Sequence, residues 1–87
     1  MIKVTYEELP EASYNPFKHH VYVYVENLRV EGIMAFAPIV AEAIEWVDDH
    51  TTDETCYISG NGSSASRSFF FLNKSDALQF KLSLRLT

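Results

Sequence analysis

The feature that most constrains the fold is a helical repeat of apolar side chains between residues 33 and 50. At about 100° per residue these side chains fall on one stripe, and the carboxylates gather on the opposite side. The stripe consists of Phe36, Val40, Ala43, Ile44 and Val47, with Ile39 and Trp46 on one flank. Such a helix buries one face against a core, so the rest of the chain must supply that core.

Pro38 determines where this helix is expected to begin. A proline in a helix interior removes a hydrogen bond and clashes with the preceding turn, at a cost of about 3 kcal/mol. In the first turn it is well tolerated. The sequence therefore predicts a main helix at about 38–49, with an apolar lead-in at 33–37 and Gly32 as the break before it.

Two strands are expected before the helix. Ile2, Val4 and Tyr6 alternate with polar residues, which is typical of a strand with one buried face. Residues 20–25 carry apolar side chains on both faces, which favours a central position in the sheet. Between these strands two prolines predict a loop, with Tyr14 and Phe17 packed back on the core. Residues 27–32 either extend the second strand or turn a hairpin.

After the helix, residues 55–59 and 69–72 predict a hairpin around a small, polar loop that should be exposed. Asn73 or Ser75 then provides a cap for a short helix at about 74–82. From residue 80 to 86, however, apolar and polar residues alternate as in a strand, so this helix could give way to a final strand near Leu82. The alternating apolar residues are Phe80, Leu82, Leu84 and Leu86.

These elements predict an α+β protein. We expect one small domain over residues 1–87, with an antiparallel sheet of four or five strands and both helices packed on one of its faces. The apolar fraction of 47% is too high for a disordered chain. The single cysteine, Cys56, has no internal disulfide partner, and the chain lacks a signal-peptide pattern and any apolar run of about 18 residues. A soluble, cytoplasmic protein is expected.

The net charge of −5 is unevenly distributed. Residues 1–54 contain eleven acidic and three basic side chains, whereas residues 55–87 contain one acidic and four basic ones. Nucleic-acid binding relies on Lys and Arg, so direct binding of DNA or RNA is not expected. The tyrosines of residues 20–25 and the phenylalanines near Phe70 could form a base-stacking sheet face. Such a face needs a basic groove, so packing in the core is the favoured interpretation.

No pattern in the chain is typical of catalysis or of a cofactor site. Carboxylates cluster around His50, and oxygen-rich clusters of this kind can hold Ca²⁺ or Mg²⁺. Their spacing fits no EF-hand loop, so a solvated helix end is favoured over a metal site. Neither Cys56 nor a serine has a histidine in a recognisable motif, and His19 and His20 have no matching metal-ligand pair. We therefore expect a protein that is not an enzyme and has no cofactor and no metal.

One family resemblance rests on the run Phe-Phe-Phe-Leu-Asn-Lys-Ser-Asp-Ala-Leu-Gln-Phe-Lys-Leu at residues 69–82, about a sixth of the chain. This aromatic strand followed by a short helix resembles the ending of many short uncharacterised proteins of T4-like tailed phages. The resemblance implies a phage accessory protein that acts in the infected bacterial cell. That class includes small binders of host enzymes and of defence systems as well as minor virion parts.

The charge pattern gives the leading functional hypothesis, a non-enzymatic protein that binds a basic protein surface through an acidic helix face. Its role would be that of an inhibitor or an anti-defence factor. The alternative is a structural or assembly component whose edge strands pair with copies of itself, as the alternation from residue 80 suggests. The expected partner-binding residues are Glu42, Glu45, Asp48, Asp49, Asp53 and Glu54.

Overall fold

The computed structural model describes residues 2–10, 16–26, 30–59 and 65–84, with residues 30–33 described by their backbone alone. Its elements, in chain order, are β1 (Ile2–Glu8), β2 (His19–Val25), α1 (Val30–His50), β3 (Cys56–Ser59), β4 (Ser66–Phe71) and α2 (Lys74–Leu84). The strands form one antiparallel sheet in the order β1-β2-β4-β3, so the predicted α+β fold and the central position of β2 are confirmed. The predicted hairpin between β3 and β4 is also present, and its loop residues 60–64 lie outside the described residues.

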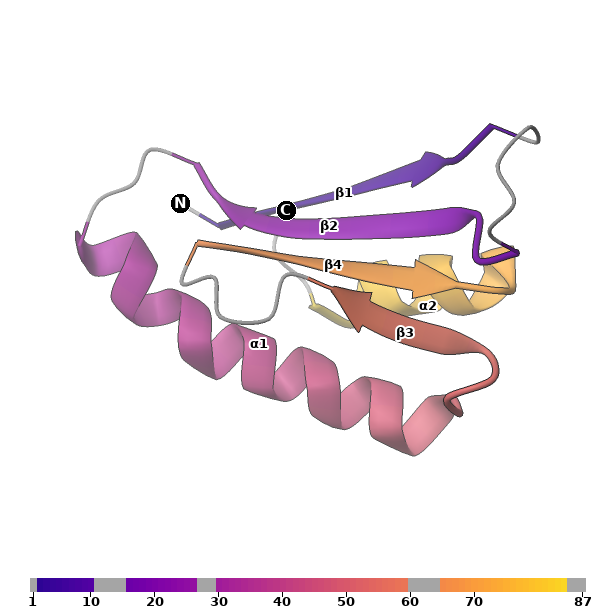
Figure 1. Cartoon of the computed structure of the whole chain (residues 1–87). Helices are drawn as coiled ribbons and strands as arrows, with labels where there is room; N and C mark the ends of the chain where they lie inside the picture. Colours follow the sequence, from indigo (N-terminus) through magenta and orange to yellow (C-terminus); the bar gives the residue numbers. More distant parts are fainter. Residues whose placement is uncertain (1, 11–15, 27–29, 60–64, 85–87) are drawn as a thin grey trace.

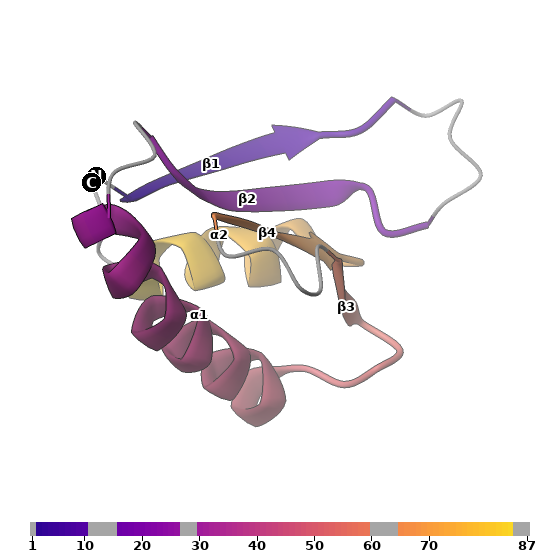
Figure 2. The same ribbon diagram turned by 60° about the vertical axis from the view of Figure 1, so that its left-hand side comes forward.

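Both helices cover the same face of the sheet, which leaves two layers (Figures 1 and 2). Alternation along β2 sends Val21, Val23 and Val25 to this face, and the cross-strand neighbours Val4 and Phe69 join them. The apolar stripe of α1 packs on these residues as predicted. Its buried members are Phe36, Val40, Ala43 and Val47, with Ile39, Ile44 and Trp46 partly buried beside them.

Phe80 of α2 lies where the sheet and the two helices meet. Its side chain is fully buried, and its ring lies 4.6 Å from that of Phe69, 5.2 Å from that of Phe71 and 5.5 Å from that of Trp46, measured between centroids. Aromatic pairs in these tilted arrangements add to the burial energy of the rings. One side chain therefore joins β4, α1 and α2.

The predicted start of α1 near Pro38 is wrong. The helix begins at Val30, so Pro38 lies inside it, and Gly32 belongs to the helix instead of breaking it. Two buried side chains, Phe36 and Val40, flank the proline, and keeping both on the core face requires helix on both sides of it. Proline has no N–H to donate to the carbonyl of Met34, four residues earlier. Pro38 and Met34 are both exposed, so water can donate to this carbonyl instead.

The predicted short helix at about 74–82 is confirmed as α2, which continues to Leu84, so the alternative of a final strand from near Leu82 is not realised in the described residues. Ala77, Phe80 and Leu84 recur at helical spacing and pack on the core, while Leu82 remains 76% exposed. The Ser83 hydroxyl donates to the carbonyl of Phe80 at 2.7 Å within this last turn. The edge-strand alternative thus loses the pattern that suggested it, and residues 85–87 lie outside the described residues.

Core packing of Tyr22, Tyr24 and Phe70 is a further expectation that the structure corrects. All three are half-buried on the face of the sheet away from the helices, because they alternate with the buried valines and phenylalanines of β2 and β4. Phe17 is found there too, with its ring edge-on to that of Tyr57. Tyr14 lies outside the described residues. The proposed extension of β2 through residue 30 fails as well, since Val30 already belongs to α1.

Candidate functional site

The six acidic residues expected to bind a partner are all exposed, and they lie along the C-terminal half of α1 and in the turn that follows it. On α1 Glu42, Glu45 and Asp49 project from the side opposite the buried stripe, and Asp48 lies on its flank, as the helical period requires. None of the six forms an ion pair with any residue in the described part of the chain. We call this surface the acidic helix end, and it consists of Glu42, Glu45, Asp48 and Asp49 on α1 with Asp53 and Glu54 in the turn that follows.

The last turn of α1 contains groups that bond its final carbonyls. The backbone N–H and the hydroxyl of Thr51 both donate to the carbonyl of Val47, at 2.8 and 2.7 Å. Nδ1 of His50 donates to the carbonyl of Trp46 at 2.9 Å, and the two rings stack at 4.3 Å. These bonds compensate in part for the unfavourable position of Asp48 and Asp49 near the negative end of the helix dipole.

A tight turn then reverses the chain into β3. The backbone N–H groups of Thr55 and Cys56 donate to the carbonyl of Thr52 at 2.9 and 3.0 Å, and Thr52 N–H donates to the Thr55 hydroxyl at 3.0 Å. Asp53 and Glu54 occupy the tip between these bonds. The turn therefore holds two carboxylates beside the end of the helix.

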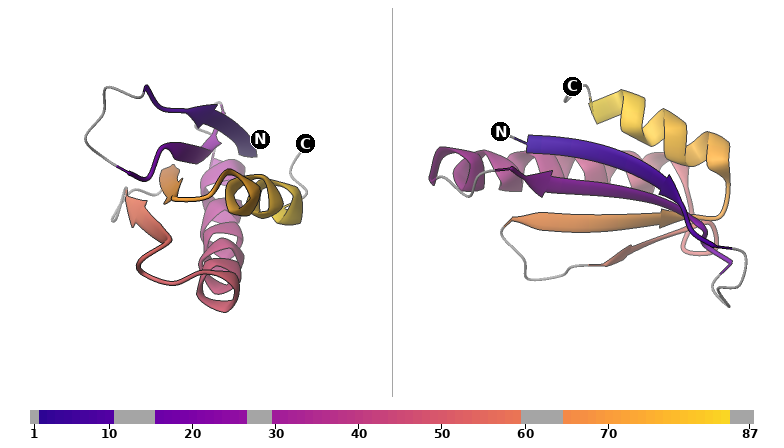
Figure 3. Two further views of the ribbon diagram at one scale, coloured as in Figure 1. Left: turned by 90° about the vertical axis from the view of Figure 1, so that its right-hand side faces the viewer. Right: turned by 90° about the horizontal axis from the view of Figure 1, so that it is seen from above.

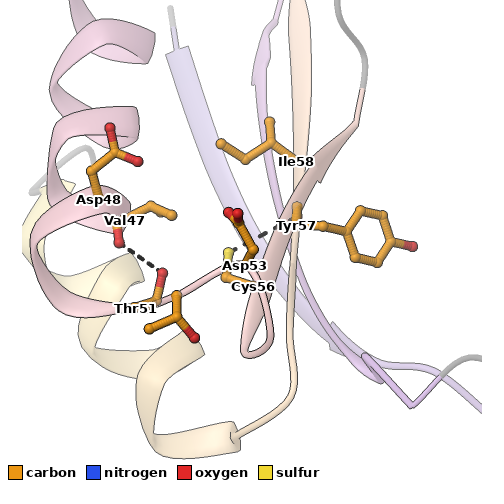
Figure 4. A pocket seen from close by; sticks show the side chains of 8 residues that line it. Val47, Asp48, Thr51, Asp53, Cys56, Tyr57 and Ile58 are labelled. Carbon is orange, nitrogen blue, oxygen red and sulfur yellow. Dashed lines mark hydrogen bonds between the residues drawn. The ribbon is translucent and has the colours of Figure 1, made fainter.

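Between α1, this turn and β3 lies a pocket of about 680 Å³ (Figure 4). Its walls combine apolar side chains with carboxylates and threonine hydroxyls. In Figure 4 the side chains of Val47, Asp53 and Ile58 extend toward the space between α1 and β3, whereas that of Tyr57 extends away from it. The lining residues are Val47, Asp48, Thr51, Thr52, Asp53, Cys56, Tyr57 and Ile58.

The thiol of Cys56 in this pocket is free and buried. The pKa of this thiol is raised to about 11, mainly by burial; a hydrogen bond with Thr51 lowers it and the charge of Asp76 adds to the rise. Its Sγ donates to the carbonyl of Tyr57 at 3.9 Å. A thiol with this pKa is protonated near neutral pH, so it lacks the thiolate that nucleophilic catalysis requires.

The structure therefore brings together only part of the predicted set in the pocket. Asp48 and Asp53 line it, while the other four members, Glu42, Glu45, Asp49 and Glu54, do not. The apolar walls could not be identified from the sequence, because Val47 reads as an ordinary core position of the helix and Ile58 as an ordinary strand residue. The pocket depends on how far β3 lies from α1, which no local pattern specifies.

Other site types find no support in the described residues. No three His, Cys, Asp or Glu side chains among them are placed to hold one metal ion. His19 and His20 point to opposite faces of β2. A hydrogen bond of 2.9 Å joins Nδ1 of His19 to the Tyr6 hydroxyl, and Nδ1 of His20 donates to Glu7 at 2.9 Å. Within the described ranges, neither helix has the length and apolar character needed to cross a bilayer.

Comparison of the chain with protein families, with curated proteins and with solved structures found no match. The functional argument therefore rests on the chemistry of its own residues.

Proposed function

We propose that this chain is a small, non-enzymatic binding protein that attaches to a basic surface of another protein through the acidic helix end. The observation that supports this proposal is the position of the pocket in the acidic helix end: two of its six carboxylates line the pocket, and none of the six pairs with a residue in the described ranges. A set of exposed carboxylates attracts any cation, whereas a pocket next to them gives a partner a shape to fit.

The chemistry of the pocket suits a lysine or arginine side chain. Such a side chain packs its methylene groups against apolar surface and leaves its charged end with polar groups. Here Val47 and Ile58 provide the apolar walls, and the carboxylates of Asp48 and Asp53 provide partners for the charge. Arginine fits best, because its planar guanidinium forms charge-assisted bonds with two carboxylate oxygens at once.

The phage resemblance supplies the biological setting of the proposal. A phage accessory protein of this kind would act in the cytoplasm of the infected bacterium and would inhibit a host enzyme or a defence factor. The strand and helix that carry the resemblance, β4 and α2, hold the core together through Phe69, Phe71 and Phe80 and contribute no residue to the pocket. The resemblance therefore concerns the fold, and the acidic helix end carries the binding.

Charge reversal tests the proposal. The triple variant Glu42→Lys, Glu45→Lys, Asp49→Lys should fold normally, because these side chains are exposed and basic residues near a helix C-terminus are slightly favourable. A partner isolated by affinity capture from bacterial lysate should associate more slowly with the variant and with a weaker salt dependence. Equal association rates and equal salt slopes for the two proteins would refute the proposal.

The pocket can be tested without a known partner. N-acetyl-arginine amide, titrated into isotope-labelled protein at low salt, should shift the NMR signals of Val47, Asp53 and Ile58, and the uncharged citrulline analogue should not. Asp48→Asn with Asp53→Asn should abolish these shifts. The matched control, Glu42→Gln with Glu45→Gln, removes the same charge outside the pocket and should retain them. Equal loss in the two variants would mean a general charge effect and would exclude a pocket for arginine.

A further inference from the structure

The face of the sheet opposite the helices is covered by no helix or strand of the described chain (Figure 3, left). An antiparallel sheet with one solvated face normally carries polar side chains there. This face instead carries a line of neighbouring rings from β2, β4, β3 and the segment before β2, which we call the aromatic row. Its members are Phe17, Tyr57, Phe70, His20, Tyr22 and Tyr24.

The rings of the aromatic row stack on one another. Phe70 lies between His20, with a centroid separation of 4.5 Å and an interplanar angle of 8°, and Tyr57, with 4.7 Å and 14°. Tyr22 and Tyr24 stack at 5.0 Å and 19°. Because these ring faces are occupied by neighbours, a nucleotide base or a sugar would have to separate the rings before it could stack. The row favours a ligand that packs over ring edges, as a protein surface does.

This face carries an ion pair and a carboxylate that accepts a hydrogen bond from a histidine. Lys3 lies 3.5 Å from Glu26, and Nδ1 of His20 donates to Glu7 at 2.9 Å. Four of the six carboxylates of the acidic helix end belong to α1, and this helix lies on the other side of the sheet (Figure 3, left). A second copy of this acidic chain can therefore approach the open face with the least repulsion, because the two acidic helix ends then lie on opposite outer sides.

The shape of the face is complementary to itself. Tyr22 lies directly opposite Ser68 across the β2–β4 pair, and Tyr24 lies opposite Ser66. A ridge of two long side chains thus runs beside a strip of two short ones. A twofold axis that lies in the plane of the interface, parallel to the strands and midway between β2 and β4, would lay the tyrosine ridge of each copy over the serine strip of the other, as an isologous interface requires.

We propose that the open sheet face is the interface of a homodimer, formed by packing the aromatic rows of two copies against each other. Four strands of up to seven residues cover a flat area of about 23 by 19 Å, or roughly 440 Å² per copy. A standard stable interface buries about 800 Å² per partner. The dimer is therefore a weak one, with a dissociation constant in the micromolar range.

Sedimentation equilibrium of the purified chain from about 5 to 500 μM tests this proposal. The wild type should pass from monomer to dimer over this range. Tyr22→Ser should raise the dissociation constant at least tenfold, and so should Ser68→Tyr, which fills the strip. The double variant, Tyr22→Ser with Ser68→Tyr, has the long side chain on β4 and the short one on β2 at this position. It should restore most of the affinity. The control variant Leu82→Ser changes the apolar side chain that is 76% exposed on α2 and should leave the constant unchanged.

Circular dichroism and thermal unfolding establish that each variant is folded. Should Tyr22→Ser unfold, Ser68→Lys tests the same interface without touching the aromatic row. A wild type that stays monomeric throughout, or a dimer that responds only to Leu82→Ser, would overturn the proposal. Binding of a twelve-nucleotide oligothymidine that is lost with Tyr22→Ser would also overturn the proposal, since that result would assign the face to single-stranded nucleic acid.

Discussion

Replacing Pro38 with alanine should stabilise the protein, and this substitution separates two descriptions of α1. In the structure the helix begins at Val30, so Pro38 interrupts its interior. Alanine would return the missing N–H, which can donate to the carbonyl of Met34, and would remove the clash of the proline ring with the preceding turn. If the helix began near residue 38 instead, the proline would occupy the first turn, where it is favourable, and alanine would bring no gain.

The size of the effect follows from the position of the proline. An interior proline is about 3 kcal/mol less favourable than alanine. Two features of the site reduce this value. Pro38 and Met34 are exposed, so water already compensates the free carbonyl, and alanine adds about 0.4–1 kcal/mol of backbone entropy to the unfolded chain. We expect a net stabilisation of about 1–2 kcal/mol, which raises the melting temperature of a domain of this size by roughly 5–15 °C.

Thermal and urea unfolding of the variant measure this change. Ala35→Gly and Ala41→Gly are the matched controls, because both alanines are exposed on α1, one before and one after the proline. In a continuous helix each should cost about 1 kcal/mol. A Pro38→Ala protein no more stable than the wild type, together with an Ala35→Gly variant that costs nothing, would show that α1 is not helical upstream of residue 38.

Two further predictions concern the core. Phe80→Ala should lower the free energy of unfolding in urea by about 3–5 kcal/mol, because it removes the fully buried ring that joins both helices to β4. Leu82→Ala, on the exposed side of the same helix, should change it by less than about 0.5 kcal/mol. Equal effects would contradict the assigned faces of α2. The pKa of the Cys56 thiol is raised to about 11, above its ordinary value of 9.0, so its contribution to stability is complete below about pH 9 and is lost as the pH rises toward 11. The wild type should therefore lose more stability than Cys56→Ala between pH 8 and 10.5, and parallel losses would contradict the burial of the thiol.

The sequence was sufficient to predict the elements in which side-chain periodicity and burial in the core indicate the same structure. The stripe of α1 is long, regular and close to the helical period, so periodicity alone gave its buried face. Apolar side chains on both faces of β2 gave its central position in the sheet. The segment from Phe80 to Leu84 is short. Phe80 and Leu84 are four residues apart, a spacing that puts two side chains on one face of a helix and also on one face of a strand. Only the packing of Ala77, Phe80 and Leu84 on the core, with Leu82 left in solvent, decides for the helix.

Burial could not be predicted where both faces of a strand are apolar. Val23 and its neighbour Tyr22 carry comparable β-propensity, and which of them meets the helices depends on where the helices pack. The same holds for Phe69 and Phe70. The absence of a basic groove argued against base stacking, and that expectation stays a prediction, but it did not follow that these rings lie in the core. An aromatic sheet face was considered only as a surface for bases, and a face that packs against protein was left out of this reasoning.

The two proposed surfaces are compatible because the sheet separates them. A dimer formed through the aromatic rows leaves both acidic helix ends on its outer sides, each with its own pocket. Binding to a partner that displays several basic sites would then gain from avidity, since attachment of one helix end raises the effective concentration of the other. Tyr22→Ser should therefore weaken capture by a surface densely coated with the partner while leaving binding to the free partner in solution unchanged. Equal weakening in both formats would mean that the aromatic row contacts the partner directly.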